Sequence, residues 1–413
     1  MFPDWFTKMF VVLFILITAA AYAGPAADEP VNLGGRVNSP DSDFGPIVTA
    51  DGDALYFTSD REGGFGGQDI WVSYRKDGEW TEPENLGPAI NTKYNEGPDS
   101  FTVDEKTMYF TRCDRLEQEG ICDIFTATRK DKDGEWKDAK RLPPEINSEY
   151  NDANASISYE GKTLYFISDR PLKGDEERDW NIFVAEKDKK GNWKKASPLG
   201  APVNTEGNEI HVLIHPDGQR LYFSSDGHGG HGGTDIFYST IEDGEFGLPR
   251  NMGKPVNTPH DDMYFSLSAS GDQAYLASSR AGTLGREDIY VLPLMIEIGP
   301  AGGNIMVRGV VFSKNSCDTP ATDPDSGQPV YDLASCRQIA GAEVEFYETG
   351  GKKPIKTAET GVSGFYQVFL PAGSDYRLEA NAEGYKKALT VLHSRGDKPN
   401  VVIEVNVFLD EKK

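Results

Sequence analysis

The sequence predicts an all-β protein, a five-bladed β-propeller closed by its N-terminal strand and followed by a β-sandwich. A motif related to Leu-Gly-x-x-(Ile/Val)-Asn-(Ser/Thr) occurs five times, and its asparagines lie 53 to 57 residues apart. A period of this size is typical of repeat architectures, in which one unit buries its faces only against its neighbours. The five asparagines are Asn38, Asn91, Asn147, Asn204 and Asn257.

Within each repeat, four short strands follow the asparagine in a constant order. The first spans 45–49 in the first copy and ends at the turn 51–52. The second, 55–57, is rich in aromatic residues, and a polar glycine-rich loop separates it from the third, 69–71. A further turn introduces the fourth strand near Trp80. β-Branched and aromatic residues between glycine turns favour antiparallel strands, and four strands per repeat are typical of a propeller blade.

The N-terminal end of the chain is expected to close the ring. The last repeat ends at 291–294 without a fourth strand, whereas a spare fourth strand lies at 30–34. We expect this N-terminal strand to complete the last blade, which gives a propeller over residues 29–294. A short linker, 295–303, follows the propeller.

The beginning of the chain has the pattern of a cleaved secretory signal, predicted over 1–23. Lys8 precedes an apolar run, 10–17, and small residues at 21–23 suit a signal peptidase. No later apolar stretch is long enough to cross a membrane. The net charge of −24 argues against nucleic acid as a partner, because phosphate binding requires clustered Lys and Arg. The sequence therefore predicts an exported protein.

The four cysteines form two local pairs. In an exported protein this spacing predicts the disulfides Cys113–Cys122 and Cys317–Cys336, one in each domain. A zinc site of four cysteines would instead require both domains to converge on one point. Each closed loop contributes about 2–3 kcal/mol by the chain-entropy estimate.

The repeat also resembles a known family. Ser59-Asp60-Arg61, followed by Gly63-Gly64-Phe65-Gly66-Gly67 and Asp69-Ile70-Trp71, looks like the TolB-type, WD40-like propeller repeat of Gram-negative periplasmic proteins. The resemblance covers all five repeats. It implies a location in the periplasm or at the outer membrane, where such propellers bind protein partners.

The region 304–410 has a second all-β pattern, with period-two alternation at 341–346 and later turn-linked strands. This order of features resembles the carboxypeptidase regulatory-like domain, a transthyretin-like β-sandwich, with an insertion that holds Cys317 and Cys336. Propeller and sandwich together resemble the central part of PorE-like, OmpA-family proteins associated with the outer membrane. Those proteins add a tetratricopeptide region and a peptidoglycan-binding domain that this sequence does not contain.

One acidic residue per repeat lies five positions after the asparagine. Each enters an innermost strand, so the propeller geometry places all five around one mouth of the central channel. Two interpretations remain. The ring binds a cation or a partner, or each acid pairs with the arginine of its own blade, as Glu96 with Arg112 or Arg115 and Asp152 with Arg170. The five acids are Asp43, Glu96, Asp152, Glu209 and Asp262.

The fourth repeat departs from this pattern. Gly227 replaces the arginine, and most of the six histidines of the chain fall in this repeat. Imidazole and carboxylate ligands suit zinc or copper, so blade four is a candidate site for zinc or another divalent metal. The alternative is a glycine-rich loop with solvated histidines. The candidate ligands are Glu209, His211, His228 and His231.

No nucleophile elbow, phosphate loop or zinc-protease motif occurs in the sequence. We therefore expect a noncatalytic scaffold of the bacterial cell envelope, without a cofactor, that presents the propeller face to a protein or to a glycan such as peptidoglycan. One alternative is an envelope hydrolase or a metal-dependent glycan-processing propeller, whose active residues come from several blades. Another is a protein that binds a metal or a small ligand through blade four.

Overall fold

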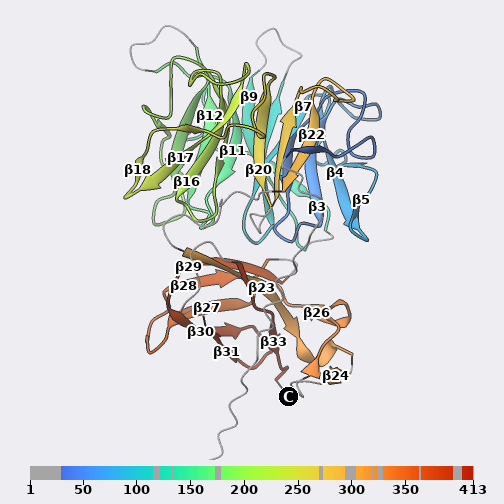
Figure 1. Ribbon diagram of the computed structural model, residues 1–413, viewed down its shortest axis with the longest axis vertical. Coiled ribbons are helices and arrows are strands. Elements are labelled where there is room, and N and C mark those ends of the chain that lie inside the picture. The colour runs from blue at the N-terminus through green and yellow to red at the C-terminus, as the bar shows by residue number, and fades with distance from the viewer. Residues whose placement is uncertain are drawn as a thin grey trace, which may run out of the picture.

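The computed structural model describes residues 29–114, 121–131, 134–172, 178–268, 273–293, 304–318, 320–322, 329–361, 364–393 and 402–412. The predicted signal segment, 1–23, and the linker, 295–303, lie outside the described residues. The described parts consist of strands, loops and two single-turn 3-10 helices, Lys314–Ser316 and Leu333–Ser335, which confirms the all-β fold class. None of their helices is long and apolar enough to cross a bilayer. Figure 1 shows the propeller above a second layered domain.

Five antiparallel sheets, which we call blades one to five, make up the propeller. Blade one has β2 (Asp43–Val48), β3 (Ala54–Ser59), β4 (Asp69–Lys76), β5 (Glu79–Trp80) and β6 (Glu84–Asn85). Blade two has β7 (Asn95–Phe101), β8 (Thr107–Cys113), β9 (Cys122–Thr128) and β10 (Lys137–Arg141). Blade three has β11 (Asp152–Ile157), β12 (Thr163–Ser168), β13 (Asn181–Glu186) and β14 (Ser197–Pro198). Blade four has β15 (Glu209–Ile214), β16 (Arg220–Ser225), β17 (Asp235–Glu242), β18 (Glu245–Phe246) and β19 (Arg250–Asn251).

Blade five contains strands from both ends of the propeller. Its sheet order is β1 (Val31–Asn32), β22 (Asp288–Pro293), β21 (Gln273–Ser278) and β20 (Asp262–Leu267). Val31 lies opposite Val291, so the N-terminal strand pairs with the last propeller strand as predicted. The Asn32 side chain also donates to the carboxylate of Asp288 at 2.6 Å. The ring is therefore closed by hydrogen bonds between residues more than 250 positions apart.

Alternating side chains of the aromatic second strand pack against the two neighbouring blades. In β3, Tyr56 joins a buried cluster with Phe110 of blade two. Leu55 and Phe57, on the other face, join a cluster with Ile289 of blade five. Successive strand residues point to opposite faces of a sheet, so one aromatic-rich strand supplies core to both sides of its blade. No blade can bury these faces alone.

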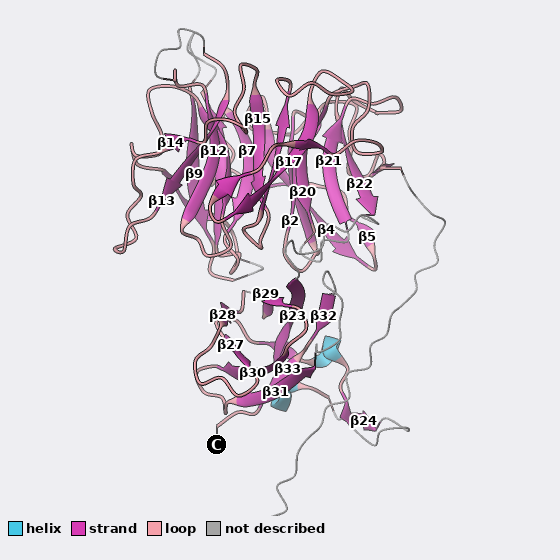
Figure 2. Ribbon diagram, turned by 60° about the vertical axis from the view of Figure 1, so that its left-hand side comes forward, coloured by secondary structure: helices cyan, strands magenta, loops and turns pink. Residues whose placement is uncertain are grey.

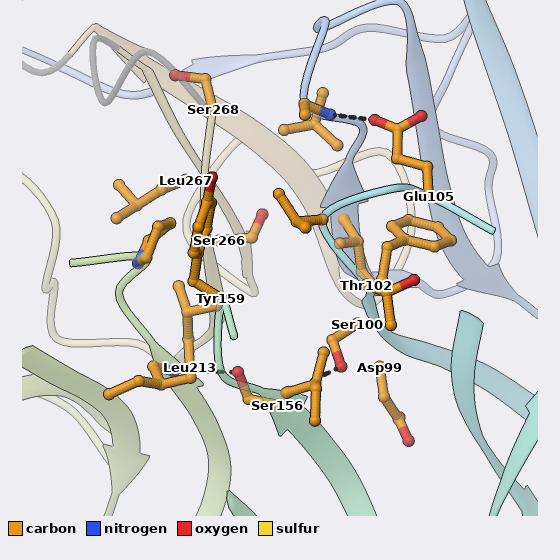
Figure 3. Close-up of a pocket in the computed structure, with 18 of the residues that line it drawn as sticks. Asp99, Ser100, Thr102, Glu105, Ser156, Tyr159, Leu213, Ser266, Leu267 and Ser268 are labelled. Atoms are coloured by element: carbon orange, nitrogen blue, oxygen red, sulfur yellow. Dashed lines mark hydrogen bonds between the residues drawn. The ribbon is translucent and has the colours of Figure 1, made fainter. Parts of the chain in front are cut away.

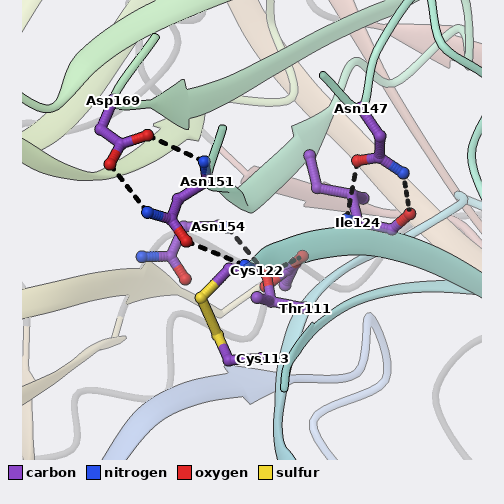
Figure 4. Close-up of a disulfide and its surroundings, with 9 residues drawn as sticks. Thr111, Cys113, Cys122, Ile124, Asn147, Asn151, Asn154 and Asp169 are labelled. Carbon is purple, nitrogen blue, oxygen red and sulfur yellow. Dashed lines mark hydrogen bonds between the residues drawn. A yellow bond between two sulfur atoms is a disulfide. The ribbon is translucent and has the colours of Figure 1, made fainter. Parts of the chain in front are cut away.

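The repeated asparagine is a clamp on the third strand of the preceding blade. Each of the five side chains accepts a hydrogen bond from the backbone N–H of one isoleucine and donates to the C=O of the same residue, at 2.8 to 3.0 Å. Figure 4 shows the pair Asn147 and Ile124. The amide thereby satisfies the buried N–H and adds a second donor to the C=O, which also accepts a backbone hydrogen bond, as Ile70 does from Leu86 at 3.0 Å. The isoleucines, in blade order from one to five, are Ile70, Ile124, Ile182, Ile236 and Ile289.

The second domain is a sandwich of two sheets around one apolar core. The sheet next to the propeller centres on β23 (Asn304–Ser313), which pairs with β26 (Arg337–Gln338), β29 (Phe365–Pro371), β32 (Val402–Glu404) and β33 (Val407–Leu409). The other sheet has the order β28 (Lys356–Glu359), β27 (Glu343–Glu348), β30 (Asp375–Asn381) and β31 (Ala388–His393). A separate pair contains β24 (Ala321–Thr322) and β25 (Pro329–Val330). Figure 2 shows β29, β23 and β32 nearest the propeller.

The sandwich contacts the end of the propeller through β29. The Tyr159 hydroxyl donates to the backbone carbonyl of Gln367. His215, which follows β15, packs its ring 5.7 Å from that of Phe369. Buried contacts of this kind place the second domain across one end of the propeller channel.

Both predicted disulfides form. Cys113 and Cys122 are opposite each other at the ends of β8 and β9, and their bond lies at the end of blade two (Figure 4). The Cys122 N–H also donates to the side chain of Asn151 in blade three. The second disulfide, Cys317–Cys336, lies in the sandwich. The described residues contain no free cysteine.

We predict that Asn38→Ala lowers the free energy of unfolding by roughly 1–3 kcal/mol, because it leaves the buried N–H of Ile289 without a partner at the closure of the ring, while the C=O keeps the N–H of Leu33. Urea denaturation followed by circular dichroism measures the change. Asn192→Ala, in an exposed turn, is the matched control and should change stability by less than about 0.5 kcal/mol. Equal effects of the two substitutions would contradict the clamp.

Candidate functional site in the central channel

The innermost strands of the five blades, β2, β7, β11, β15 and β20, surround a central channel. At the end away from the sandwich the channel contains a cavity of about 380 Å³, which we call the channel mouth. Polar and aromatic side chains line it together, among them Thr58, Asn95, Asn154, Trp180 and Tyr264. A second cavity of about 170 Å³, which we call the interdomain cavity, lies at the opposite end against the sandwich.

The five predicted acids lie at the start of the innermost strands, but they are buried. Each is at most 1 % exposed, and each accepts hydrogen bonds from the backbone N–H and hydroxyl of the serine or threonine next to its clamp asparagine. Four also pair with an arginine: Asp43 with Arg61, Glu96 with Arg112, Asp152 with Arg170 and Asp262 with Arg280. Arg115 lies outside the described residues. The acids thus follow the second interpretation, pairing within the blade.

Each of these arginines also links two further parts of its blade. It donates to the backbone carbonyl that precedes the clamp asparagine, as Arg61 does to Val37 at 2.6 Å. Its guanidinium lies over aromatic rings, 5.0 Å from that of Phe57 in blade one. The arginine therefore connects a buried carboxylate, a loop carbonyl and the blade core, which is a structural role.

In blade four, His228 takes the position of the missing arginine. Its Nε2 donates to the carbonyl of Val203 at 2.8 Å, and its ring lies 5.3 Å from that of Phe223. The same nitrogen is 4.0 Å from Glu209. Glu209 accepts hydrogen bonds from Thr205 and Ser225 but has no guanidinium beside it. Burial therefore raises its pKa to about 7.

The predicted metal site in blade four does not fit this geometry. The described residues contain no group of three or more His, Cys, Asp or Glu side chains placed to hold a metal ion. The Nε2 of His228 donates to the carbonyl of Val203. The backbone N–H of His231 donates to Asp235 in its own loop. His211 lies farther along β15, against Tyr264. Gly227 occupies the position that holds arginine in blades one, three and five, and the neighbouring His228 makes the contact with the loop carbonyl instead.

Asp99 of β7, which the sequence analysis did not identify, faces the interior of the channel, where it lines the interdomain cavity (Figure 3). A bulge between Pro98 and Ser100 interrupts the pairing with β8 at this position. The Thr111 hydroxyl donates to both carboxylate oxygens at 2.9 and 3.0 Å, and no arginine lies against it. Burial in the channel wall raises the pKa of Asp99 to about 7. Both protonation states of Asp99 are therefore populated at neutral pH.

Two residues of other blades, Asn154 and Tyr264, lie in the channel near Asp99. Asn154 and Tyr264 have left-handed backbones, with φ of 50° and 54°, at bulges in β11 and β20. Such conformations are costly for residues other than glycine and often occur at functional sites. The backbone N–H of Asn154 donates to Thr111, which connects blade three to Asp99. The ring of Tyr264 lies 5.3 Å from that of His211.

The electrostatics of this layer favour neutral groups. Burial lowers the pKa of His211 to about 3, so its imidazole is neutral at physiological pH. Burial raises the pKa of Tyr264 to about 12, so its phenol keeps its proton. Asp99 is consequently the group in this layer that gains or loses a proton near neutrality. Such an acid can donate a proton to a bound molecule and take it back.

A signal for Asp99 is present in the sequence. The equivalent positions of the other repeats hold Pro46, Ala155, Val212 and Phe265. A single acid among apolar or proline residues at one repeat position departs from the scaffold pattern. The acids common to all repeats have structural roles, and Asp99 is not one of them.

The comparisons with known proteins concern the fold. No family model and no curated protein matches this chain. Among solved structures, an endo-arabinase from Bacteroides thetaiotaomicron is 14 % identical, with 65 % of this chain and 97 % of that chain covered at a TM-score of 0.41. A putative TolB from Agrobacterium tumefaciens is 16 % identical over 65 % of this chain and 97 % of that chain, at 0.39. A GH43_1 enzyme from Xanthomonas citri is 14 % identical over 64 % and 89 %, at 0.43.

These matches correct one expectation from the sequence. We expected a noncatalytic interaction scaffold without enzymatic activity, but the similar propellers are mostly glycoside hydrolases, and a TolB-like protein is among the remainder. At these identities the likeness extends to the fold alone. Any chemistry assigned to this chain has to follow from its own residues.

We predict that Glu209→Gln raises stability at pH 8 by up to about 3 kcal/mol, because the folded state no longer has to bury a charged carboxylate. The pKa of Glu209 is raised on folding from 4.5 to about 7, so the wild-type protein loses stability as the pH rises through this interval. The Glu209→Gln variant should lose less stability over the same pH interval. Thermal unfolding at pH 5 and pH 8 tests this, with the exposed Glu242→Gln in the same blade as control. A variant with the wild-type pH profile would contradict the assignment.

Proposed function

We propose that this protein is a glycan-processing propeller of the bacterial cell envelope, with its active site in the channel around Asp99. The observation that carries the proposal is a carboxyl group without an arginine partner, its pKa raised to about 7, in the channel wall one residue beyond Pro98 of the channel mouth. An enclosed carboxylic acid that titrates near neutral pH is the form of general acid that glycoside hydrolysis uses.

The channel mouth supports binding of a sugar. Its volume, about 380 Å³, is in the range of small-molecule sites. Phe44, Trp180 and Tyr264 supply ring surfaces, and Asn95 and Gln68 supply hydrogen-bond donors and acceptors. A sugar ring has apolar C–H faces and polar edges, so it matches a site that combines both kinds of side chain.

In the proposed reaction, Asp99 donates its proton to the oxygen of the scissile glycosidic bond. A second carboxylate is required to activate water or to attack the sugar. Glu96 lines the mouth from the same strand, and Arg112 beside it favours the ionised form even though burial raises its pKa. We assign Glu96 this second role. The leaving group departs as an alcohol with the proton from Asp99, and the proton that the attacking water loses as it bonds to the sugar restores the protonated form of Asp99 through solvent.

The cellular location and the resemblance of the sandwich to a known domain family are part of the same proposal. The signal pattern at 1–23 supports export, and an outer-membrane association follows from the resemblance to TolB-type propellers. The resemblance of 304–410 to the carboxypeptidase regulatory-like domain makes the sandwich an accessory module. A glycan of the envelope is the partner that fits both the location and the channel.

We predict that the purified protein hydrolyses at least one member of a panel of 4-nitrophenyl glycosides, and that Asp99→Asn lowers kcat by about 100-fold or more, because it removes the proton donor. Activity should fall as the pH rises through about 7, where Asp99 loses its proton. Asp77→Asn, in an exposed turn, should retain wild-type activity. Failure to hydrolyse any glycoside, or unchanged kcat in folded Asp99→Asn, would refute the proposal.

A further inference from the structure

The interdomain cavity, at the end of the channel opposite the mouth, has residues from all five propeller blades and the sandwich in its wall. Propeller residues such as Phe101, Ile157 and Leu267 contribute apolar surface, and Phe365 and Gln367 come from β29 of the sandwich. Figure 3 shows Ser266, Tyr159 and Leu213 around the same space. The glycan proposal takes Asp99, which lines this cavity, as its acid, but it places the sugar in the channel mouth.

Three polar atoms in the wall of this cavity have no hydrogen-bond partner. They are Oγ of Ser266, Oε1 of Gln367 and Nδ1 of His211. Ser266 and Gln367 are 5 % and 4 % exposed. A buried polar group without a partner costs about 1–3 kcal/mol, and native structures contain few of them. Three around one cavity, on two blades and on the second domain, point to a bound molecule that supplies the missing partners.

The cavity determines the size and charge of that molecule. Its volume of about 170 Å³ is close to that of a protein cavity known to take up benzene, about 150 Å³. Its walls offer no free cation: His211 is neutral, the charge of Glu105 is paired with Arg129 at 3.2 Å, and Asp99 has its pKa raised to about 7. An anion would therefore be buried without compensation, whereas a neutral molecule suits Asp99 in its protonated form.

The number of polar atoms restricts the ligand further. A monosaccharide carries four or five hydroxyl groups, and most of them would face apolar walls without partners. A ring with one or two hydroxyl or carbonyl groups matches both the apolar walls and the three unpartnered atoms. We propose that the interdomain cavity binds a small neutral ring compound with one or two such groups, and that Gln367 and Ser266 recognise its polar atoms. The sandwich is then part of a binding site.

Phenol is the probe that tests this site, titrated into the full-length protein by isothermal calorimetry. We expect saturable binding at one site with millimolar or tighter affinity. Gln367→Leu should weaken it about tenfold, because one hydrogen bond is lost. Gln338→Leu, exposed in the same domain, should leave it unchanged. Ser266→Ala gives a second variant in the propeller, where a similar loss is expected.

Three outcomes would overturn the proposal: no saturable phenol binding, binding of D-xylose at the same site as tightly as phenol, or equal phenol affinity in the wild-type protein and both folded variants. Circular dichroism establishes that the variants are folded. Because the readout is binding of phenol and not glycoside hydrolysis, its failure leaves the glycan proposal untouched, and the reverse also holds.

Discussion

The structure depends on one repeated interaction, the buried asparagine that satisfies the backbone N–H and C=O of an isoleucine in the preceding blade. The fourth strand of each blade is short, so the third strand has backbone groups beyond it that water cannot reach. The asparagine amide supplies the missing partner of the N–H and a second donor to the C=O, which also accepts a backbone N–H. Because Asn38 does this for Ile289, the same interaction that joins neighbouring repeats also joins the two ends of the ring.

A second constraint follows at the start of each innermost strand, where a buried acid is held by a hydroxyl and a cation. In four blades the cation is an arginine that forms an ion pair with the acid. In blade four, His228 lies 4.0 Å from Glu209 and forms no such close pair. Glu209 is left with a pKa raised to about 7 as a consequence. Asp99 shows the same effect inside the channel, where no cation compensates its burial. The acids paired with arginine, Glu96 among them, stabilise the propeller, and Asp99 without such a partner can exchange a proton near neutral pH.

The sequence predicted the features that recur. Five asparagines with a constant spacing indicated the repeats, and the missing fourth strand of the last repeat predicted the pairing of Val31 with Val291. Features that occur once were not predictable in this way. Asp99 belongs to a single repeat, and His228 replaces the arginine from a position one residue later in the loop. The cavity at the sandwich depends on how two domains meet, which no periodicity within either domain encodes.

The most direct test of the account is the titration of the Asp99 carboxyl group. Carbon-13 labelling of aspartate side chains, with Asp99→Asn to assign the signal, follows its protonation by NMR. We expect a midpoint near pH 7, since burial without a cation favours the neutral acid. A midpoint near 4, the ordinary value for aspartate, would mean that the carboxyl is ionised throughout the neutral range and has no proton to donate.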